Sequence, residues 1–76
     1  MITVKQMLEQ KGPEVWTISP EATVYEALKI MADKDLGALI VVENDQVVGI
    51  MSERDYARKV MLRGKSSLDT PVKDIM

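Results

Sequence analysis

The stretch Val47-Val48-Gly49-Ile50-Met51-Ser52-Glu53-Arg54-Asp55 decides the fold, because it changes from a strand pattern to a helix pattern within a few residues. Its first five residues are apolar and rich in β-branched side chains, which predicts a buried strand, whereas residues 56–63 have helical spacing. Ser52 is therefore predicted at a helix N-cap. Backbone N–H groups and the positive end of the helix dipole meet there, so a phosphate can bind, and Asp55 offers two acceptors to a ribose diol.

The pair Ser52 and Asp55 also has a second interpretation. A Ser-x-x-Asp sequence at the start of a helix is a capping box, in which each side chain hydrogen-bonds to the backbone of the other residue. Such a box stabilises the helix with no ligand present. The heptapeptide from Gly49 to Asp55 alone leaves a nucleotide contact and a purely structural cap both open.

The segments before this stretch predict a small sheet. Residues 38–42 are almost entirely apolar, which favours a strand covered on both faces, and residues 43–46 form a polar turn. Residues 47–51 are then the antiparallel partner strand. Further upstream, residues 15–18 are rich in β-forming side chains and lie between two Pro-containing segments, which predicts a short first strand.

Helical patterns surround these strands. Val4, Met7 and Leu8 predict a short amphipathic helix that stops at Lys11-Gly12-Pro13, and Thr23-Val24-Tyr25-Glu26 is a capping box before a helix that runs to about residue 34. After Ser52, a longer helix is expected to end at Gly64 and to turn three apolar side chains inward: Ala57, Val60 and Met61. The predicted fold class is α+β, with a short N-terminal helix, then β-α-β-β-α and a three-stranded sheet.

Composition excludes several classes of protein. The chain is 46% hydrophobic with a net charge of −2, which indicates a globular domain and disfavours general nucleic-acid binding. It has neither Cys nor His, so disulfides, thiolate chemistry and the usual zinc ligands are absent and a hydrolase is disfavoured. The N-terminus has no signal-peptide pattern and no apolar run is long enough to span a membrane, which predicts a soluble, cytoplasmic protein.

The end of the chain repeats its beginning. Thr70-Pro71-Val72-Lys73-Asp74-Ile75-Met76 resembles Thr3-Val4-Lys5-Gln6-Met7, and Thr70 and Pro71 are predicted as the N-cap and first residue of a helix. A chain of 76 residues buries only about 60% of its unfolded surface, so its core is thin and a partner or a second repeat is expected. A second unit therefore starts near residue 70 in this interpretation.

Three segments together resemble a cystathionine β-synthase (CBS) domain over nearly the whole chain. They are Ile18-Ser19-Pro20-Glu21-Ala22-Thr23-Val24 leading into Glu26-Ala27-Leu28, then Leu36-Gly37-Ala38-Leu39-Ile40-Val41-Val42, then residues 47–55. The last segment fits the family's Gly-apolar-x-Ser/Thr-x-x-Asp signature. The resemblance assigns residues 1–76 to one CBS repeat.

The resemblance implies a regulatory binding module. Such repeats normally pair into a Bateman module that binds adenosine compounds such as AMP, ATP, NAD or S-adenosylmethionine. This chain holds one repeat, so residues 70–76 look like the start of a missing second repeat in a truncated fragment or proteolytic product. A homodimer through a second copy of the repeat is then the expected partner arrangement.

The resemblance also assigns two half-sites that belong to different pockets. Ser52 and Asp55 bind phosphate and ribose, with Ile50 and Met51 lining that half. The other half faces adenine and contains Val15, Trp16, Gly37 and Ala38.

Three side chains near these half-sites have two interpretations each. Arg54 suits a bidentate phosphate contact, or is part of a solvated charged face. Trp16 stacks on adenine or packs in a dimer interface. Gly37 lets the backbone turn into its strand, and it also leaves room for a purine.

A regulatory adenine-nucleotide sensor that is not an enzyme is the leading functional hypothesis. The alternative is a structural dimerisation module without ligand. An enzyme using Asp55 or Glu53 as a general base lacks a second polar group, and nucleic-acid binding rests only on a local basic strip of Arg54, Arg58, Lys59, Arg63 and Lys65.

Overall fold

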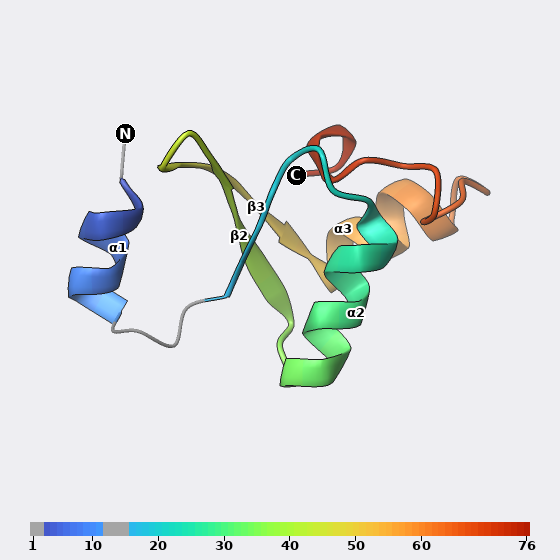
Figure 1. Ribbon diagram of the computed structural model, residues 1–76. Helices are drawn as coiled ribbons and strands as arrows, with labels where there is room; N and C mark the ends of the chain where they lie inside the picture. Colours follow the sequence, from blue (N-terminus) through green and yellow to red (C-terminus); the bar gives the residue numbers. More distant parts are fainter. Residues whose placement is uncertain (1–2, 12–15) are drawn as a thin grey trace.

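The structure, a computed structural model, describes residues 3–11 and 16–76 (Figure 1). The elements in chain order are α1 (Val4–Lys11), β1 (Thr17–Ile18), α2 (Val24–Lys34), β2 (Ala38–Glu43), β3 (Gln46–Ser52), α3 (Glu53–Tyr56), the π-helical turn η1 (Ala57–Met61) and the 3₁₀ turn η2 (Val72–Asp74). The predicted α+β class is therefore confirmed, with an N-terminal helix followed by β-α-β-β-α. Val15, predicted to begin the first strand, lies outside the described residues.

The three strands form one mixed sheet in the order β1-β2-β3. β1 runs parallel to β2, with Thr17 opposite Ile40, and β2 runs antiparallel to β3, with Leu39 opposite Met51. Asn44 and Asp45 join β2 to β3 with φ values of 51° and 62°. Two residues in this left-handed region give a hairpin turn whose twist matches that of the strands.

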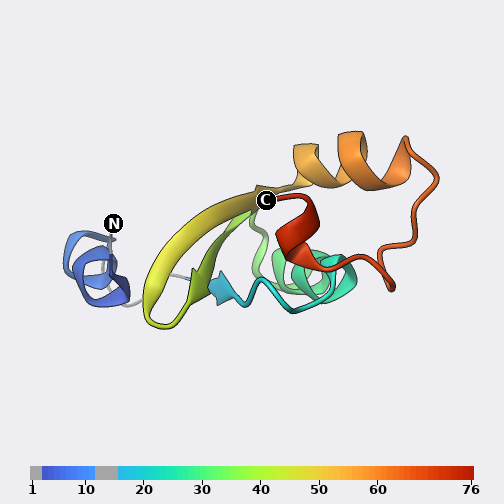
Figure 2. The same ribbon diagram turned by 90° about the horizontal axis from the view of Figure 1, so that it is seen from above.

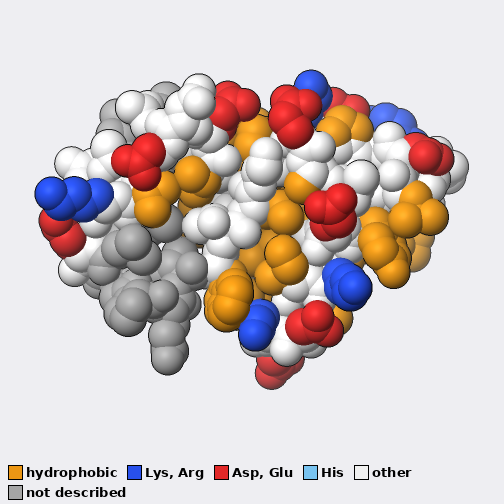
Figure 3. Space-filling model, viewed as in Figure 1, with side chains coloured by type: hydrophobic (Ala, Val, Ile, Leu, Met, Phe, Trp, Pro, Cys, Tyr) orange, Lys and Arg blue, Asp and Glu red, His pale blue; other side chains and the backbone are white. Residues whose placement is uncertain are grey.

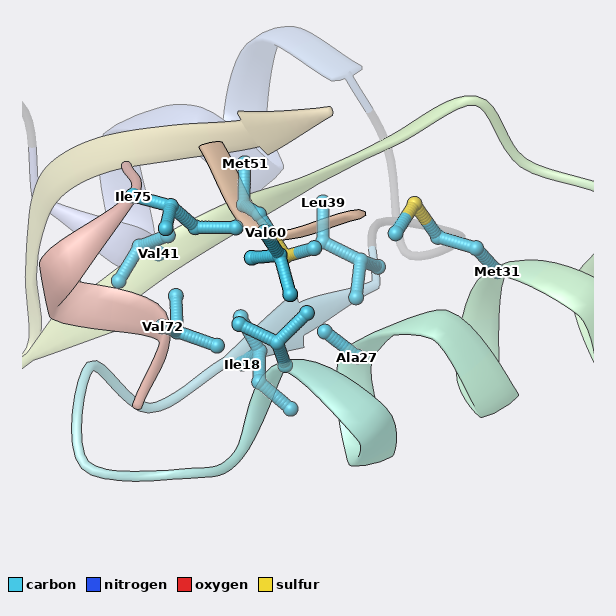
Figure 4. Packing of buried hydrophobic residues seen from close by; sticks show 10 residues of the cluster. Ile18, Ala27, Met31, Leu39, Val41, Met51, Val60, Val72 and Ile75 are labelled. Carbon is cyan, nitrogen blue, oxygen red and sulfur yellow. The ribbon is translucent and has the colours of Figure 1, made fainter. Parts of the chain in front are cut away.

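One face of the sheet, here called the inner face, forms the core (Figures 2 and 4). α2, η1 and the C-terminal residues cover it, and their apolar side chains interlock with those of the strands. The buried apolar residues are Ile18, Val24, Ala27, Met31, Leu39, Val41, Met51, Val60, Val72 and Ile75. α2 begins as predicted, because Thr23 Oγ1 accepts a hydrogen bond from Glu26 N–H at 3.1 Å.

The opposite face of the sheet, here called the outer face, is only partly covered. Ile40 and Val42 are half-buried, and Ile50, opposite Ile40, is 53% exposed. The prediction that residues 38–42 are covered on both faces is therefore wrong for this chain alone. An apolar strand pattern shows that the strand has apolar side chains on both faces, but among the described residues the buried cluster lies on the inner face.

The helix after Ser52 differs from the prediction. α3 has only 4 residues, and η1 then widens the turn, with Leu62 N–H donating to Ala57 C=O at 3.0 Å. The helical segment ends at Met61, earlier than predicted, and Gly64 lies in the turn that follows, with φ of 67°. Val60 is buried as predicted, but Met61 is 56% exposed, because the wider turn rotates it away from the core. Figure 3 shows apolar side chains gathered over η1 and the following loop.

The start of the C-terminal turn is also shifted relative to the prediction. Pro71 is the N-cap and η2 begins at Val72, so Thr70 is not the cap. The backbone at Pro71 is extended because Pro71 pairs with Thr23 in an antiparallel bridge, and the Thr70 hydroxyl instead donates to Ser66 C=O at 2.7 Å. Across residues 3–11 and 16–76, no helix combines the length and apolar character needed to cross a bilayer.

Candidate functional site

Ser52 and Asp55 form a complete capping box at the junction of β3 and α3. Asp55 Oδ2 accepts hydrogen bonds from Ser52 N–H at 3.0 Å and from the Ser52 hydroxyl at 2.9 Å. In return, Asp55 N–H donates to Ser52 Oγ at 3.1 Å. The N-cap position predicted for Ser52 is therefore confirmed, and these bonds fix both side chains in one geometry.

The capping box uses only one of the two carboxylate oxygens of Asp55. Oδ1 has no partner closer than Lys59 Nζ at 3.6 Å among the described residues, and the Asp55 side chain is 26% exposed. A carboxylate oxygen has more than one acceptor direction, so Oδ1 can accept a hydroxyl hydrogen while Oδ2 keeps its bonds to Ser52. The two interpretations of this motif are thus physically compatible.

Asp55 is ionised at neutral pH. Burial alone would raise the pKa of Asp55. Hydrogen bonds from Ser52 N–H and the Ser52 hydroxyl, together with the Lys59 ammonium, lower the pKa by more than burial raises it, so it lies below its ordinary value. An ionised carboxylate only accepts hydrogen bonds and repels phosphate. Asp55 therefore suits the hydroxyl groups of a sugar.

Two backbone donors at the start of α3 already have partners. Glu53 N–H donates to Gly37 C=O at 3.0 Å, and Asp55 N–H already donates to Ser52 Oγ. The prediction that open N–H groups at this helix end bind a phosphate therefore does not fit these two positions. With only 4 residues, α3 also contributes a small dipole.

Gly37 and Ala38 lie next to Ser52, so the structure joins segments that the sequence assigned to different half-sites. Ala38 is the direct partner of Ser52 across β2 and β3, and the Gly37 carbonyl is bonded to Glu53. A Cβ placed on Gly37 would meet no atom within 4 Å. The chain turns into β2 at Asp35, with φ of 55°, so glycine is not required for that turn. The open space beside Gly37 fits the second interpretation, that of room for a flat ligand.

Trp16 lies just before β1 and is 45% exposed. Lys34, the last residue of α2, places its ammonium 4.4 Å from the centre of the indole ring. This cation–π contact fixes one face of the indole. Val15, the other predicted adenine-facing residue of this strand, lies outside the described residues.

The remaining predicted site residues differ in exposure. Arg54 is exposed and, within residues 3–11 and 16–76, forms no ion pair, so its guanidinium is available to an anion. Ile50 is exposed on the outer face. The prediction that Met51 lines the site is wrong, since its side chain points into the core and is fully buried. The cause is strand alternation, which places Ile50 and Met51 on opposite faces.

Lys59 also belongs to the site, although the sequence analysis did not identify it as a site residue. Its ammonium lies near Asp55 Oδ1 and also donates to Ile75 C=O at 3.2 Å. The spacing of Asp55 and Lys59, four apart on a helix, is a signal that was available in the sequence. The contact with Ile75, which is distant along the chain, could not be predicted from the sequence.

Among the described residues, no group of three acidic side chains is arranged to bind a metal ion.

Comparisons with known proteins give one family. The family model of the CBS domain matches residues 4–62. A CBS domain-containing protein of Arabidopsis thaliana, CBSX3, mitochondrial, is 39% identical over 97% of this chain. The structure of a putative signal-transduction protein with CBS domains from Burkholderia ambifaria is 47% identical, with a TM-score of 0.82 over 99% of this chain.

A hexameric CBS-CP12 protein from bloom-forming cyanobacteria is 39% identical, with a TM-score of 0.74. The match covers 83% of this chain and 38% of the CBS-CP12 chain. The chain spans 39% of the Arabidopsis protein and 57% of the Burkholderia chain. CBS domains generally act as regulatory modules in pairs and often bind adenosine-containing ligands. The matched segment includes every strand, the Ser52 and Asp55 box and the open position at Gly37. The chain therefore belongs to the CBS-domain family.

Proposed function

We propose that this chain is one half of a regulatory adenosine-ligand sensor that works through paired repeats. The proposal is supported most directly by one end of the sheet, where Ser52 and Asp55 lie beside Ala38 and Gly37. There, an ionised carboxylate with a spare oxygen lies near an open space that no side chain fills. A ribose hydroxyl on Asp55 Oδ1 and a purine near Gly37 account for both features.

The phosphate contact in this proposal comes from side chains and not from the helix end. Arg54 is exposed beside the box, and its guanidinium can bind phosphate oxygens in a bidentate manner. The Ser52 hydroxyl donates its hydrogen to Asp55 Oδ2, so Ser52 Oγ keeps only a lone pair, which can accept from a ribose hydroxyl and not from a phosphate oxygen. AMP, ATP, NAD and S-adenosylmethionine all offer the adenosine part, so the assay below includes each of them.

The module is proposed to be a binding domain and not an enzyme. A general base works best when its pKa lies near neutrality, whereas the pKa of Asp55 is held below its ordinary value by Ser52 and Lys59. Asp55 therefore accepts hydrogen bonds at neutral pH but takes up a proton poorly.

A second repeat completes the pair in this proposal. Ile50, on the edge strand β3, is 53% exposed on the outer face, and Trp16, just before β1, is 45% exposed. A second copy packed on the outer face would bury both and would bring a second set of ligand contacts close to the first. That residues 70–76 begin a further repeat of the same polypeptide stays a prediction, as does the cytoplasmic location.

The alternative, a dimerisation module without ligand, is favoured by one specific observation. Every bond of the capping box joins Ser52 to Asp55, so these two residues have a structural role in either case. On this alternative, the outer face still pairs, but no compound changes the stability of the pair.

Isothermal titration calorimetry separates the two functions. AMP, ATP, NAD and S-adenosylmethionine are titrated into the protein at a concentration where sedimentation has established its oligomeric state. Asp55→Asn is the informative variant, because the amide oxygen can still accept from Ser52 N–H while the charge is lost. Asp33→Asn, an exposed carboxylate of α2, is the matched control.

Saturable heat that Asp55→Asn weakens at least tenfold, and that Asp33→Asn leaves unchanged, supports the sensor. A tenfold loss equals about 1.4 kcal/mol of binding free energy. No heat with any compound from a folded dimer supports the structural alternative.

A further inference from the structure

The segment 57–68, here called the basic-apolar segment, has a composition that the proposed function does not use. The chain has 12 acidic residues and a net charge of −2, yet none of the acidic residues lies between Asp55 and Asp69. The segment contains four cations instead: Arg58, Lys59, Arg63 and Lys65. Positive charge is thus concentrated in one short part of an acidic chain.

Three large apolar side chains of the same segment are exposed. Met61, Leu62 and Leu68 are 56%, 75% and 62% exposed. A single exposed leucine is common on a protein surface, but here apolar side chains gather over η1 and the following loop (Figure 3). A group of exposed apolar side chains with polar neighbours marks a surface that binds a protein or a membrane.

The π-helical turn η1 brings cations and apolar side chains onto one surface. Arg58 lies three positions before Met61 and four before Leu62, which makes these side chains neighbours on a helical surface. The wide turn buries Val60 and leaves Met61 outside the core. Lys65 N–H then donates to Val60 C=O at 2.9 Å, so the following loop folds back against the end of η1.

Three of the four cations are available to a partner. Within residues 3–11 and 16–76, Arg58, Arg63 and Lys65 are exposed and form no ion pair. Lys59 differs from them, because its ammonium lies 3.6 Å from Asp55 Oδ1. The basic-apolar segment therefore presents three cations beside three apolar side chains, which suits a partner that is both negatively charged and apolar.

The basic-apolar segment lies at a projecting end of the molecule. In both ribbon views, the loop after η1 is at the opposite end from α1 (Figures 1 and 2). A protein that binds protruding apolar side chains needs a groove shaped to receive them. A bilayer needs no such groove, because its head-group region accepts apolar side chains while cations stay beside the lipid phosphates.

A second copy of this chain fits the basic-apolar segment poorly. Two identical surfaces that face each other across a twofold axis would bring Arg58, Arg63 and Lys65 of one copy near the same cations of the other. Like charges repel at an interface. The pairing proposed above uses the outer face, whereas η1 covers the inner face, so that pairing leaves the basic-apolar segment free (Figure 4).

We propose that the basic-apolar segment docks this chain on a membrane that contains anionic phospholipids. Arg58, Arg63 and Lys65 bind lipid phosphates, and Leu62 and Leu68 enter the boundary between head groups and acyl chains. The chain then lies on the bilayer and does not cross it. Each Lys or Arg near such a surface strengthens binding about fivefold, so binding through three cations and a few apolar side chains is reversible.

Co-sedimentation of the full chain with vesicles tests the proposal. Vesicles of phosphatidylcholine alone are compared with vesicles of equal parts phosphatidylcholine and phosphatidylglycerol. The expected result is at least tenfold tighter binding to the anionic vesicles, and a loss of that binding as the salt concentration rises. Equal binding to the two kinds of vesicle, or binding to neither, overturns the proposal. Nucleotide is not part of this assay, so its outcome is separate from that of the calorimetry.

A pair of charge variants shows whether the basic-apolar segment is the surface that binds. Arg58→Gln with Arg63→Gln should weaken binding to the anionic vesicles at least tenfold. Lys5→Gln with Lys29→Gln removes the same charge from exposed positions elsewhere and should change that binding by less than about twofold. Equal losses for the two variants would mean that only the total charge matters, and this would overturn the proposal.

An apolar variant separates a membrane from other partners. Leu62→Ser with Leu68→Ser should weaken vesicle binding at least tenfold, and it should leave the fold intact because both side chains are exposed. Urea denaturation followed by circular dichroism checks the fold. Two other results overturn the proposal. The first is tight binding of an oligothymidine strand, measured by anisotropy, with no binding to vesicles. The second is a loss of self-association in this variant with vesicle binding unchanged.

Discussion

The two faces of one small sheet differ in how completely the chain covers them. On the inner face, Leu39, Val41 and Met51 are at most 1% exposed under α2, η1 and the C-terminal residues 70–76. On the outer face of the same strands, Ile50 is 53% exposed. Residues of equal hydrophobicity thus differ in role: the inner face stabilises the fold of this chain, and the outer face is the surface that we propose for pairing with a second repeat.

The largest effect is expected on the inner face. Leu39→Ala should lower the free energy of unfolding by about 2–5 kcal/mol, because it removes a fully buried side chain and leaves a cavity. Urea denaturation followed by circular dichroism measures this change. Leu62→Ala, at a position that is 75% exposed, is the control and should change the unfolding free energy by less than about 0.5 kcal/mol. Equal losses for the two variants would contradict the assignment of the core.

A second, smaller effect concerns the capping box at the end of the sheet. Because the folded-state pKa of Asp55 is lowered, its contribution to stability is present above the unfolded pKa of about 3.9 and is lost as the pH falls through the folded value. The chain should therefore be more stable than Asp55→Asn at pH 7, by roughly 1 kcal/mol for a helix cap. The difference should shrink below pH 4.

Urea denaturation of both proteins at several pH values between 7 and 2.5 measures this dependence. Other carboxylates titrate in the same range, but they are common to the two proteins and cancel in the difference. Asp33→Asn serves as the exposed control. A stability difference between Asp55→Asn and the unchanged chain that stays constant from pH 7 to pH 2.5 would remove the ionic role assigned to Asp55.

The outer face gives a third test, in which stability and association separate. Ile50→Lys should change the unfolding free energy of the isolated chain by less than about 1 kcal/mol, since the side chain is half exposed. It should weaken self-association at least tenfold, because a charged group would be buried without a partner. Sedimentation velocity over a range of concentrations measures the association.

Leu62→Lys is the matched control for this test, because Leu62 is an exposed apolar residue away from the sheet. If Leu62→Lys disrupts the dimer and Ile50→Lys does not, the interface lies on the helical side, and the comparison of the two faces loses its functional meaning.

The elements that sequence analysis predicted well are those fixed by neighbouring residues. The cap at Thr23, the box at Ser52 and Asp55, and the turn at Gly64 after the last helical residue each depend on bonds or dihedral angles within a few residues. Strand alternation in residues 38–51 was also visible, although it was not applied to Met51. Local chemistry is sufficient for such features.

The features that sequence analysis missed depend on contacts between distant segments. η1 forms where the chain after α3 must bury Val60 and leave Met61 outside, and the Pro71 cap follows from pairing with Thr23. The contact of Lys59 with Ile75 likewise joins two segments that only the fold brings together. Coverage of the outer face was overestimated for a related reason, since an apolar strand pattern does not say whether the cover comes from the same chain.

The smallest effect on stability is expected at Gly37, and it is the most informative about the ligand. An added methyl group meets no atom within 4 Å, and the backbone φ of Gly37 is not positive, so Gly37→Ala should leave the unfolding free energy unchanged or raise it by up to about 1 kcal/mol. If a purine occupies the open space beside Gly37, the same methyl group should weaken adenosine-ligand binding at least tenfold. Thermal unfolding with and without the ligand measures both quantities in one experiment, because bound ligand raises the melting temperature. A Gly37→Ala protein that keeps full ligand affinity would show that the ligand does not approach this position, and the end of the sheet would then be open for some reason other than binding.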